Sequence, residues 1–352
     1  MPDLEQLIAQ AQTSELFSSP HLEADLGRFL QEQAGAVRAL AADARGRGTQ
    51  SVYFVGSGGS WASMYSGKYL CDRFAPVASD VALSYDLIWR APRRLGPESL
   101  VVLASYSGAT EDTLAALRFA RERGARTVAL VRDADSPIGS EADDTFAYDS
   151  PGLYSLPLMA VSLLALEWGR LDGNREAAEL MERLAEVPAQ VGEAFRSTRE
   201  PGRELAEQLG DSDLLYCVGA GPLYGLAYKF GLTVFMENMR INGSVIESGE
   251  FRHGPAEALE RQRPDVAVVL GTDESRAMTL RTLEFMQANG ARTFVFDAAH
   301  HPGVHPLLTP FVLKVALQWF IVHAALARGI DDLDARVYMG RQVLSQDGAR
   351  WP

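Results

Sequence analysis

The sequence predicts an α/β protein with two open, mainly parallel β-sheets in tandem, each flanked by helices. Three observations indicate this fold class: a helix-and-strand segment that occurs twice, short apolar runs that end in turn residues, and amphipathic helical spacing between those runs. The chain has 352 residues, of which 47% are hydrophobic and 22% charged. This composition is typical of a globular protein with enough apolar residues for a large core in each half.

The duplicated segment predicts a helix, a turn and a strand in each half of the chain. Residues 113–127 and 279–293 are identical at 8 of 15 positions, with a constant offset of 166. Each copy spaces leucine and phenylalanine as an amphipathic helix does, then reaches a glycine that can end the helix and continues into an apolar, β-rich run. Helix, turn and strand in this order form half of a βαβ unit.

Further strands are predicted from short, continuous apolar runs, which suit strands that are buried on both faces of a parallel sheet. These runs are residues 51–55, 100–104, 214–218 and 266–270. The first and the third are each followed by a glycine-rich loop, at an offset of 163. The two halves therefore repeat the same order of elements.

We expect domain boundaries near residues 35 and 195. Residues 1–35 have helical periodicity and are predicted to form an N-terminal helical segment. Residues 36–195 and 196–352 are predicted to form the first and the second α/β domain. Residues 174–209 are charged and contain no long apolar run, so they are predicted to form helices that join the two halves.

Charge and cysteine content exclude several classes of function. The net charge of −13 disfavours nucleic acid as a partner, since phosphate backbones are bound by clustered lysine and arginine. Cys71 and Cys217 are the two cysteines, which is too few for a disulfide framework and suits a reducing cytoplasm. The N-terminus lacks the features of a secretory signal. Residues 311–327 are the most apolar stretch, but polar residues interrupt it, so a buried helix is expected there and no contact with a membrane.

Two hydroxyl-rich loops follow predicted strands of the first half, at residues 56–60 and 105–110. In open α/β sheets, ligands bind beyond the carboxyl ends of the strands. Glycines let backbone amides approach an anion, hydroxyls add donors, and the following helix N-terminus carries partial positive charge. Together these groups could hold a phosphate without lysine or arginine. The predicted ligands are Ser57, Gly59, Ser60, Ser105, Tyr106, Ser107 and Thr110.

Each loop taken alone could be structural, as a tight turn or as a helix N-cap. Comparison with the second half favours ligand binding by the loops of the first half, because the equivalent loops of the second half lack these residues. Two acids stand in place of Ser107 and Gly108, and Pro222 and Leu223 stand in place of Gly59 and Ser60. Folding requirements would act on both copies alike.

A dinucleotide site is a rival interpretation of the glycines in the first loop. Asp80 lies at about the distance expected of a ribose-binding acid. The glycine order is G-x-G-G-x rather than G-x-G-x-x-G, however, so NAD is disfavoured and we expect no organic cofactor.

The second half offers acid–base chemistry. His253 stands between charged residues and a Gly-Pro turn, and an imidazole can donate or accept a proton near neutral pH. Glu237 lies in the largely apolar, helical segment 224–240 and is a candidate base. The structural alternatives are a turn-capping histidine and an exposed glutamate near a helix end.

Other histidines and aromatic residues are predicted to be structural. His323 lies in the apolar segment 311–327 and is predicted to be a core residue. A cluster with two prolines and no cysteine or glutamate nearby is predicted to be a surface loop rather than a metal site: it consists of His300, His301 and His305. An aromatic stripe at helical spacing is predicted to pack or to form an interface: it consists of Trp61, Tyr65 and Tyr69.

These residues resemble the motifs of the sugar isomerase (SIS) domain proteins, which carry two such α/β domains in tandem. Residues 105–113 are similar to the S-x-S-G-x-T-x-[DE]-T phosphate loop of that family. Residues 247–255 are similar to the motif E-x-x-E-[LF]-[KR]-H-G-P, which the isomerase half of glucosamine-6-phosphate synthase shares with the fructosamine-6-phosphate deglycases. The resemblance covers roughly residues 30–345. It implies that a sugar phosphate is held by Ser60, Ser105, Ser107 and Thr110.

The resemblance also implies roles for the two acid–base candidates. Glu237 stands sixteen residues before His253, which is the position of the catalytic glutamate in this group. His253 is implied to reach the site of a neighbouring subunit and to assist ring opening there. Active sites shared in this way would require a homodimer or a higher homo-oligomer.

Departures from the motifs separate the subfamilies. The synthase isomerase has a lysine where this chain has Val234, and a second lysine in its C-terminal tail where this chain has Gly340 beside Arg341. Residues 235–240 look more like the deglycases. We expect neither a glutamine amidotransferase domain nor a helix-turn-helix domain ahead of the chain, which disfavours ammonia-channelling synthesis and gene regulation.

The resulting hypothesis is a cytoplasmic deglycase that cleaves a 6-phosphorylated fructosamine, an Amadori product, to hexose 6-phosphate and an amine or amino acid. One alternative is an aldose–ketose isomerase or an amino-sugar-phosphate deaminase on the same scaffold. Another is a sugar-phosphate sensor that binds without turnover. No metal is needed for the hypothesised reaction, and none is predicted.

Overall fold

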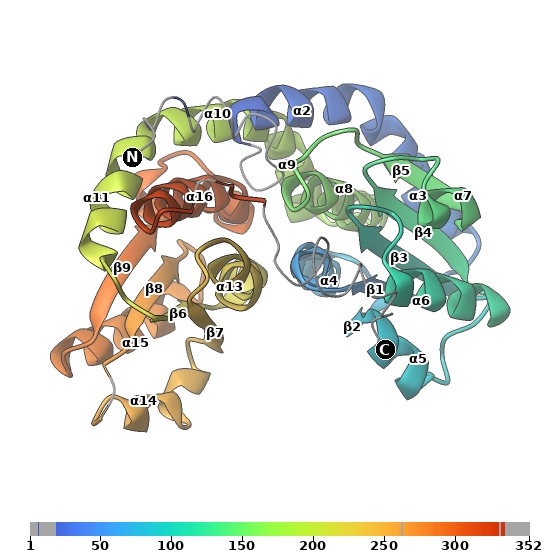
Figure 1. Ribbon diagram of the computed structural model, residues 1–352. Helices are drawn as coiled ribbons and strands as arrows, with labels where there is room; N and C mark the ends of the chain where they lie inside the picture. Colours follow the sequence, from blue (N-terminus) through green and yellow to red (C-terminus); the bar gives the residue numbers. More distant parts are fainter. Residues whose placement is uncertain (1–5, 7–18, 262, 331, 335–352) are drawn as a thin grey trace.

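The structure, a computed structural model, describes residues 6, 19–261, 263–330 and 332–334. Two parallel sheets lie on either side of a central group of helices, and further helices arch over them (Figure 1). We call residues 34–171, with the first sheet, the first lobe, and residues 214–327, with the second sheet, the second lobe. In Figure 1 the first lobe lies on the right and the second on the left.

The first sheet has five parallel strands in the order β2-β1-β3-β4-β5. They are β1 (Ser51–Gly56), β2 (Ala78–Leu83), β3 (Ser99–Ser105), β4 (Arg126–Val131) and β5 (Asp144–Ala147). Every residue of β1 and β3 is buried, since helices cover both faces of the sheet. The strands predicted at residues 51–55 and 100–104 are therefore confirmed.

The second sheet has four parallel strands in the order β7-β6-β8-β9. They are β6 (Leu214–Gly219), β7 (Asn242–Glu247), β8 (Asp265–Leu270) and β9 (Arg292–Asp297). The predictions at residues 214–218 and 266–270 are confirmed as β6 and β8. The duplicated segment forms the same elements in both lobes, namely α6 (Glu111–Glu122) before β4 and α15 (Arg276–Ala288) before β9.

The strand order places a topological switch point in each sheet. The chain passes from β1 to β2 on one side and then crosses to β3 on the other, so the loops after β1 and β3 diverge at the carboxyl edge. Open α/β sheets bind ligands in such a crevice. The two hydroxyl-rich loops predicted from the sequence are the loops at this switch point.

One hydrophobic core joins the two lobes. Side chains alternate along β1, so that Val52 and Phe54 belong to this shared core, whereas Tyr53 and Val55 pack in a smaller core on the outer face of the first sheet. Among the helices, α8 (Ser155–Leu171) and α16 (Thr309–Ala327) contribute the most residues to the shared core, and α4 (Gly59–Phe74) contributes further ones. A third core lies between α15 and the second sheet.

Helix α16 is the apolar segment noted in the sequence. It is the one helix in the described ranges that is long and apolar enough to cross a membrane, but 89% of its most apolar window is buried inside the fold. Helices α10 and α11 and strand β9 pack against it. The prediction of a buried helix is confirmed.

The stretch between the lobes is helical, as predicted for residues 174–209. It contains α9 (Arg175–Arg183), α10 (Val187–Ser197) and α11 (Arg199–Leu209). Helix α10 packs against α2 (Ser19–Glu32), which is the described part of the predicted N-terminal segment, and both lie in the arch above the lobes (Figure 1). Further helices are α3 (Ala34–Gly46), α5 (Ser84–Arg90), α7 (Pro137–Glu141), α12 (Tyr224–Tyr228), α13 (Phe235–Asn238) and α14 (Pro255–Ala258).

His323 on α16 should make the fold sensitive to acid. It is buried beside the ring of Trp319, and burial, helped by Arg199 and Arg203, lowers its pKa from 6.5 to about 4. The folded state thus favours the neutral imidazole. Above pH 6.5 the imidazole is neutral in both the folded and the unfolded state, so no stability is lost. As the pH falls from 6.5 toward 4, the unfolded state binds a proton first, and the folded state loses on the order of 3 kcal/mol of stability at most.

The measurement is the free energy of unfolding by urea at pH 7 and at pH 4.5 for wild type and for His323→Leu. We expect the loss of stability on acidification to be smaller in the leucine variant by about 1–3 kcal/mol. His300→Gln, on an exposed loop, is the matched control and should behave as wild type. An equal acid response in His323→Leu and wild type would contradict the assignment.

Candidate active site

A cavity of about 1120 Å³ opens between the two lobes at the carboxyl edge of the first sheet. The loops after β1 and β3 form one wall, and the helical segment of the second lobe that ends in α13 forms the other. The cavity brings together seven of the nine residues predicted from the sequence: Ser57, Gly59, Ser60, Tyr106, Ser107, Thr110 and Glu237.

Ser105 is the predicted phosphate ligand that does not line this cavity. It is buried at the end of β3, where its hydroxyl is 2.7 Å from Thr110 Oγ1 and accepts a hydrogen bond from the Gly108 amide at 3.1 Å. The Ser107 hydroxyl in turn accepts a hydrogen bond from the Ala109 amide at 3.2 Å. Ser105 therefore shapes the loop, while Ser107 and Thr110 line the cavity.

Gly108 allows this loop to close against its neighbour. Its φ of +62° is in the left-handed region, and a Cβ at this position would stand 2.0 Å from Ser136 Oγ. Ser136 caps α7 by accepting a hydrogen bond from the Gly139 amide, and the Gly108 carbonyl accepts one from the Ile138 amide at 2.8 Å. The first turn of α7 thus packs directly on the backbone of the loop.

Asp112 links the two loops. Its carboxylate accepts a hydrogen bond from the Ser57 hydroxyl, whose oxygen also lies 3.2 Å from Ser84 Oγ. Ser84 and Thr113 share a further hydrogen bond of 2.9 Å. The sequence offered only a general reason for an acid here, since the first turn of α6 favours negative charge in any helix. The structure adds that this acid fixes the first loop beside the second.

Glu237 reaches the cavity from the second lobe. The helix that carries it is interrupted by a π-helical segment, η3 (Lys229–Val234), before α13. Gly231 in this segment lies so close to β7 that a Cβ would be 2.4 Å from the Ser244 carbonyl oxygen, and one on Gly243 would be 2.2 Å from the Gly231 carbonyl oxygen. Through this backbone contact, the helix packs closely against β7 at the edge of the second sheet. π-helical turns occur often at functional sites.

His253 does not line the cavity of its own chain. It is exposed and follows η4 (Glu250–Arg252), and its Nε2 accepts a hydrogen bond of 3.0 Å from Arg252 Nε. Gly254, with a φ of +137°, turns the chain into α14, which lies at the far end of the second lobe in Figure 1. The structure therefore does not bring His253 and Glu237 together within one chain.

Several residues of the cavity were missed by sequence reasoning. Lys229 and Arg132 both line it, whereas the loops alone were expected to hold an anion without a basic residue. Arg132 follows β4, donates a hydrogen bond of 2.9 Å to the Tyr106 hydroxyl and lies over its ring. Lys229 could have been noticed as a single basic residue inside an apolar run. The other polar residues that line the cavity are Asp133, Asp149, Thr233, Asn238 and Asp334.

The remaining candidates lie away from the cavity. Asp80 on β2 forms an ion pair of 2.6 Å with Arg90, so it is not placed to bind a ribose at this site. The loop of His300, His301 and His305 follows β9, and burial lowers the pKa values of the last two. Within the described ranges no group of three or more potential metal ligands occurs. Gly340 and Arg341 lie outside the described residues.

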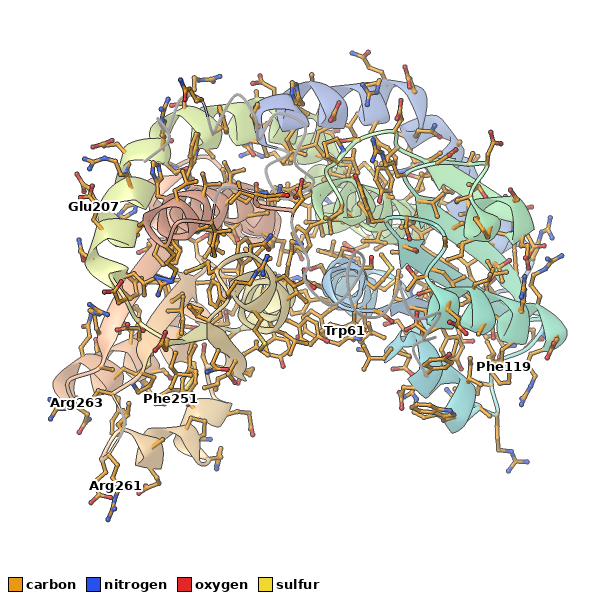
Figure 2. All side chains as sticks on the ribbon, in the orientation of Figure 1. Trp61, Phe119, Glu207, Phe251, Arg261 and Arg263 are labelled. Carbon is orange, nitrogen blue, oxygen red and sulfur yellow. The ribbon has the colours of Figure 1, made fainter. Side chains whose placement is uncertain are left out.

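The aromatic stripe on α4 packs between the lobes. Trp61 lies 4.3 Å from Tyr228 and 5.6 Å from Tyr65 between ring centroids, and Tyr65 lies 5.2 Å from Tyr224. Figure 2 shows Trp61 at the junction of the two lobes. The predicted packing role is confirmed for Trp61 and Tyr65, and their partners are on α12.

Comparisons with known proteins agree with this architecture. A sequence model of the SIS domain matches residues 47–166. Fructoselysine 6-phosphate deglycase of Escherichia coli is 31% identical over 330 residues, which cover 93% of this chain and 97% of that protein. A fructosamine deglycase of Bacillus subtilis is 31% identical over 318 residues, which cover 86% and 95%.

A solved structure also has the fold of this chain. A Bacillus subtilis protein described as a phosphosugar isomerase superposes with a TM-score of 0.78 at 31% identity, and the match covers 87% of this chain and 98% of that one. The chain therefore belongs to the family of SIS-domain proteins that includes the fructoselysine 6-phosphate deglycases.

Proposed function

We propose that this protein is a deglycase that cleaves a 6-phosphorylated fructosamine to hexose 6-phosphate and a free amine or amino acid. The observation that carries the proposal is that Glu237 lines the same cavity as Ser107 and Thr110. A base is thus available for the carbonyl end of a sugar phosphate, and an anion-binding loop for its phosphate end. The names and the coverage of the two deglycase relatives support the same substrate class.

The phosphate is the anchor in this proposal. Ser107, Thr110 and the backbone of the loop between them precede α6, whose N-terminus carries partial positive charge. Binding energy from this remote group holds the reacting carbons in place and so lowers the barrier at the other end of the substrate. The Ser57–Asp112 hydrogen bond keeps the first loop at the same site.

Glu237 performs the proton transfer. In the open-chain ketosamine it removes a proton from C1 while the C2 oxygen gains one, which gives an enaminol. Protonation of C2 then leaves an imine between C1 and the amine nitrogen. Water adds to C1 and the amine departs, so one fructosamine 6-phosphate and one water yield one hexose 6-phosphate and one amine. Proton transfer of this kind contributes about 10²–10⁴-fold to rate when the base is well placed.

His253 would assist ring opening in the cavity of a neighbouring subunit. Its exposure at the end of the second lobe supports this arrangement, since the residue is accessible to another copy of the chain. The proposal therefore includes a homodimer or a higher homo-oligomer. It also includes two SIS domains, at residues 36–195 and 196–352, and a cytoplasmic location.

A turnover screen tests the function. Purified protein is incubated with fructosamine 6-phosphates of several amino acids, and both free amino acid and hexose 6-phosphate are quantified. We expect equimolar release of the two products, and none from the unphosphorylated fructosamines. Interconversion of aldose and ketose phosphates, or ammonia release from amino-sugar phosphates, without amino acid release would instead identify an isomerase or a deaminase. Binding without any turnover would indicate a sensor.

A further inference from the structure

Lys229 places a buried ammonium group against the glycine loop of the other lobe. It is the first residue of η3, it lines the cavity, and it is only 6% exposed. Its Nζ lies 3.1 Å from the position that a Cβ on Gly59 would occupy. Gly59 is the first residue of α4, so the ammonium lies beside the first turn of a 16-residue helix.

The surroundings of this ammonium favour an anion. The amide groups at the N-terminus of α4 carry partial positive charge, which adds to that of the lysine. Complete burial, with a smaller contribution from the charge of Lys229, holds the pKa of Lys314 on α16 well below its usual value. The loop 56–60 contains no carboxylate. Lys229 and the N-terminus of α4 therefore both contribute positive charge beside Gly59.

Lys229 and Glu237 occupy the same side of their helix. Residues 229, 233 and 237 all line the cavity, and the Thr233 hydroxyl donates a hydrogen bond to the Lys229 carbonyl. Eight residues of α-helix advance about 12 Å, and a π-helical turn somewhat less. This separation is comparable with the distance from C1 to the phosphate of an open-chain hexose 6-phosphate. With C1 and C2 at Glu237, the phosphate end falls near Lys229 and Gly59.

We propose that Lys229 is a phosphate-binding residue, contributed by the second lobe, which binds the 6-phosphate together with the hydroxyl loops of the first lobe. The inference rests on the proposed function in taking a 6-phosphorylated sugar as the ligand. It adds a cation from the second lobe to predicted phosphate ligands that are hydroxyls and backbone amides of the first lobe. It also makes the phosphate a link between the lobes, because its ligands come from both.

The test compares Lys229→Met with Lys68→Met. Lys68 lies on α4 outside the cavity, where it pairs with Asp72, so its loss changes the net charge equally without touching the site. Dissociation constants for glucose 6-phosphate and for inorganic phosphate are measured by titration calorimetry. We expect Lys229→Met to weaken both by about 10- to 100-fold, the usual effect of losing a charge-assisted hydrogen bond, and Lys68→Met to bind as wild type. Wild-type affinity in Lys229→Met would overturn the proposal.

A second variant keeps the test decisive if Lys229→Met does not fold. In Lys229→Gln a polar side chain remains at this position, but its positive charge is lost. We expect weaker phosphate binding with an unchanged melting temperature of the free protein, and unchanged binding would overturn the proposal. Binding is measured without turnover. A protein that binds through Lys229 but cleaves no fructosamine would therefore overturn only the proposed function, and turnover with wild-type affinity in Lys229→Met would overturn only the role of Lys229.

Discussion

Replacing Glu237 with glutamine should reduce kcat on a 6-phosphorylated fructosamine by about 10²–10⁴-fold, which is the usual contribution of a positioned general base. Glutamine keeps the size and shape of the side chain, but its amide cannot take up the proton from C1. The hydroxyl loops lie on the other lobe and are left intact, so the dissociation constant for hexose 6-phosphate should hardly change. Steady-state kinetics of amino acid release and calorimetric titration measure the two quantities.

Glu284→Gln is the matched control for this variant. Glu284 is exposed on α15, which belongs to the same lobe but lies outside the cavity, so the same change of charge there should leave kcat and affinity as in wild type. A Glu237→Gln enzyme that retained most of its kcat would remove Glu237 from the mechanism. A loss of phosphosugar binding in that variant would mean that Glu237 shapes the binding site, and the proton transfer would need another base.

The central strands could be predicted from the sequence because burial on both faces leaves a simple signal, an uninterrupted apolar run. Three of the four edge strands, β2, β5 and β7, gave no such signal. Strand β7 starts with Asn242, Gly243 and Ser244, and β2 is mostly half-exposed, because an edge strand has only one neighbour and is less covered. Strand β5 has only four residues. Periodicity cannot detect elements that are this short and this polar.

The site was predictable where its chemistry lies in contiguous residues. The loop 105–110 places four hydroxyl side chains directly before a helix, and this local pattern is visible in the sequence itself. Lys229 and Arg132 were missed because their meaning depends on which loop they face, and that is set by packing of the lobes and by strand order. The role of Asp112 could not be predicted because its partner Ser57 is 55 positions away.

Replacing Gly108 with alanine should damage both the loop and the activity. An alanine in the left-handed region loses about 1–2 kcal/mol of stability. Overlap with Ser136, whose Oγ would be 2.0 Å from the new Cβ, should add about 1–3 kcal/mol, because α7 must move away from the loop. Displacement of Ser107 and Thr110 by about 1 Å is enough to cost on the order of 10²-fold in kcat/KM, since the phosphate anchor orients the reacting carbons.

Gly48→Ala is the control that separates backbone strain at a positive φ from overlap with Ser136. Gly48 also has a positive φ, +76°, but no atom lies within 4 Å of the position of its Cβ, and it is outside the cavity. We expect this control to lose only the conformational part, about 1–2 kcal/mol by urea unfolding, with unchanged kcat/KM. If Gly108→Ala lost no more stability than Gly48→Ala and kept its kcat/KM, close packing of α7 on the loop would not be what positions the phosphate. Ser107 and Thr110 would then have to be held by hydrogen bonds within the loop alone.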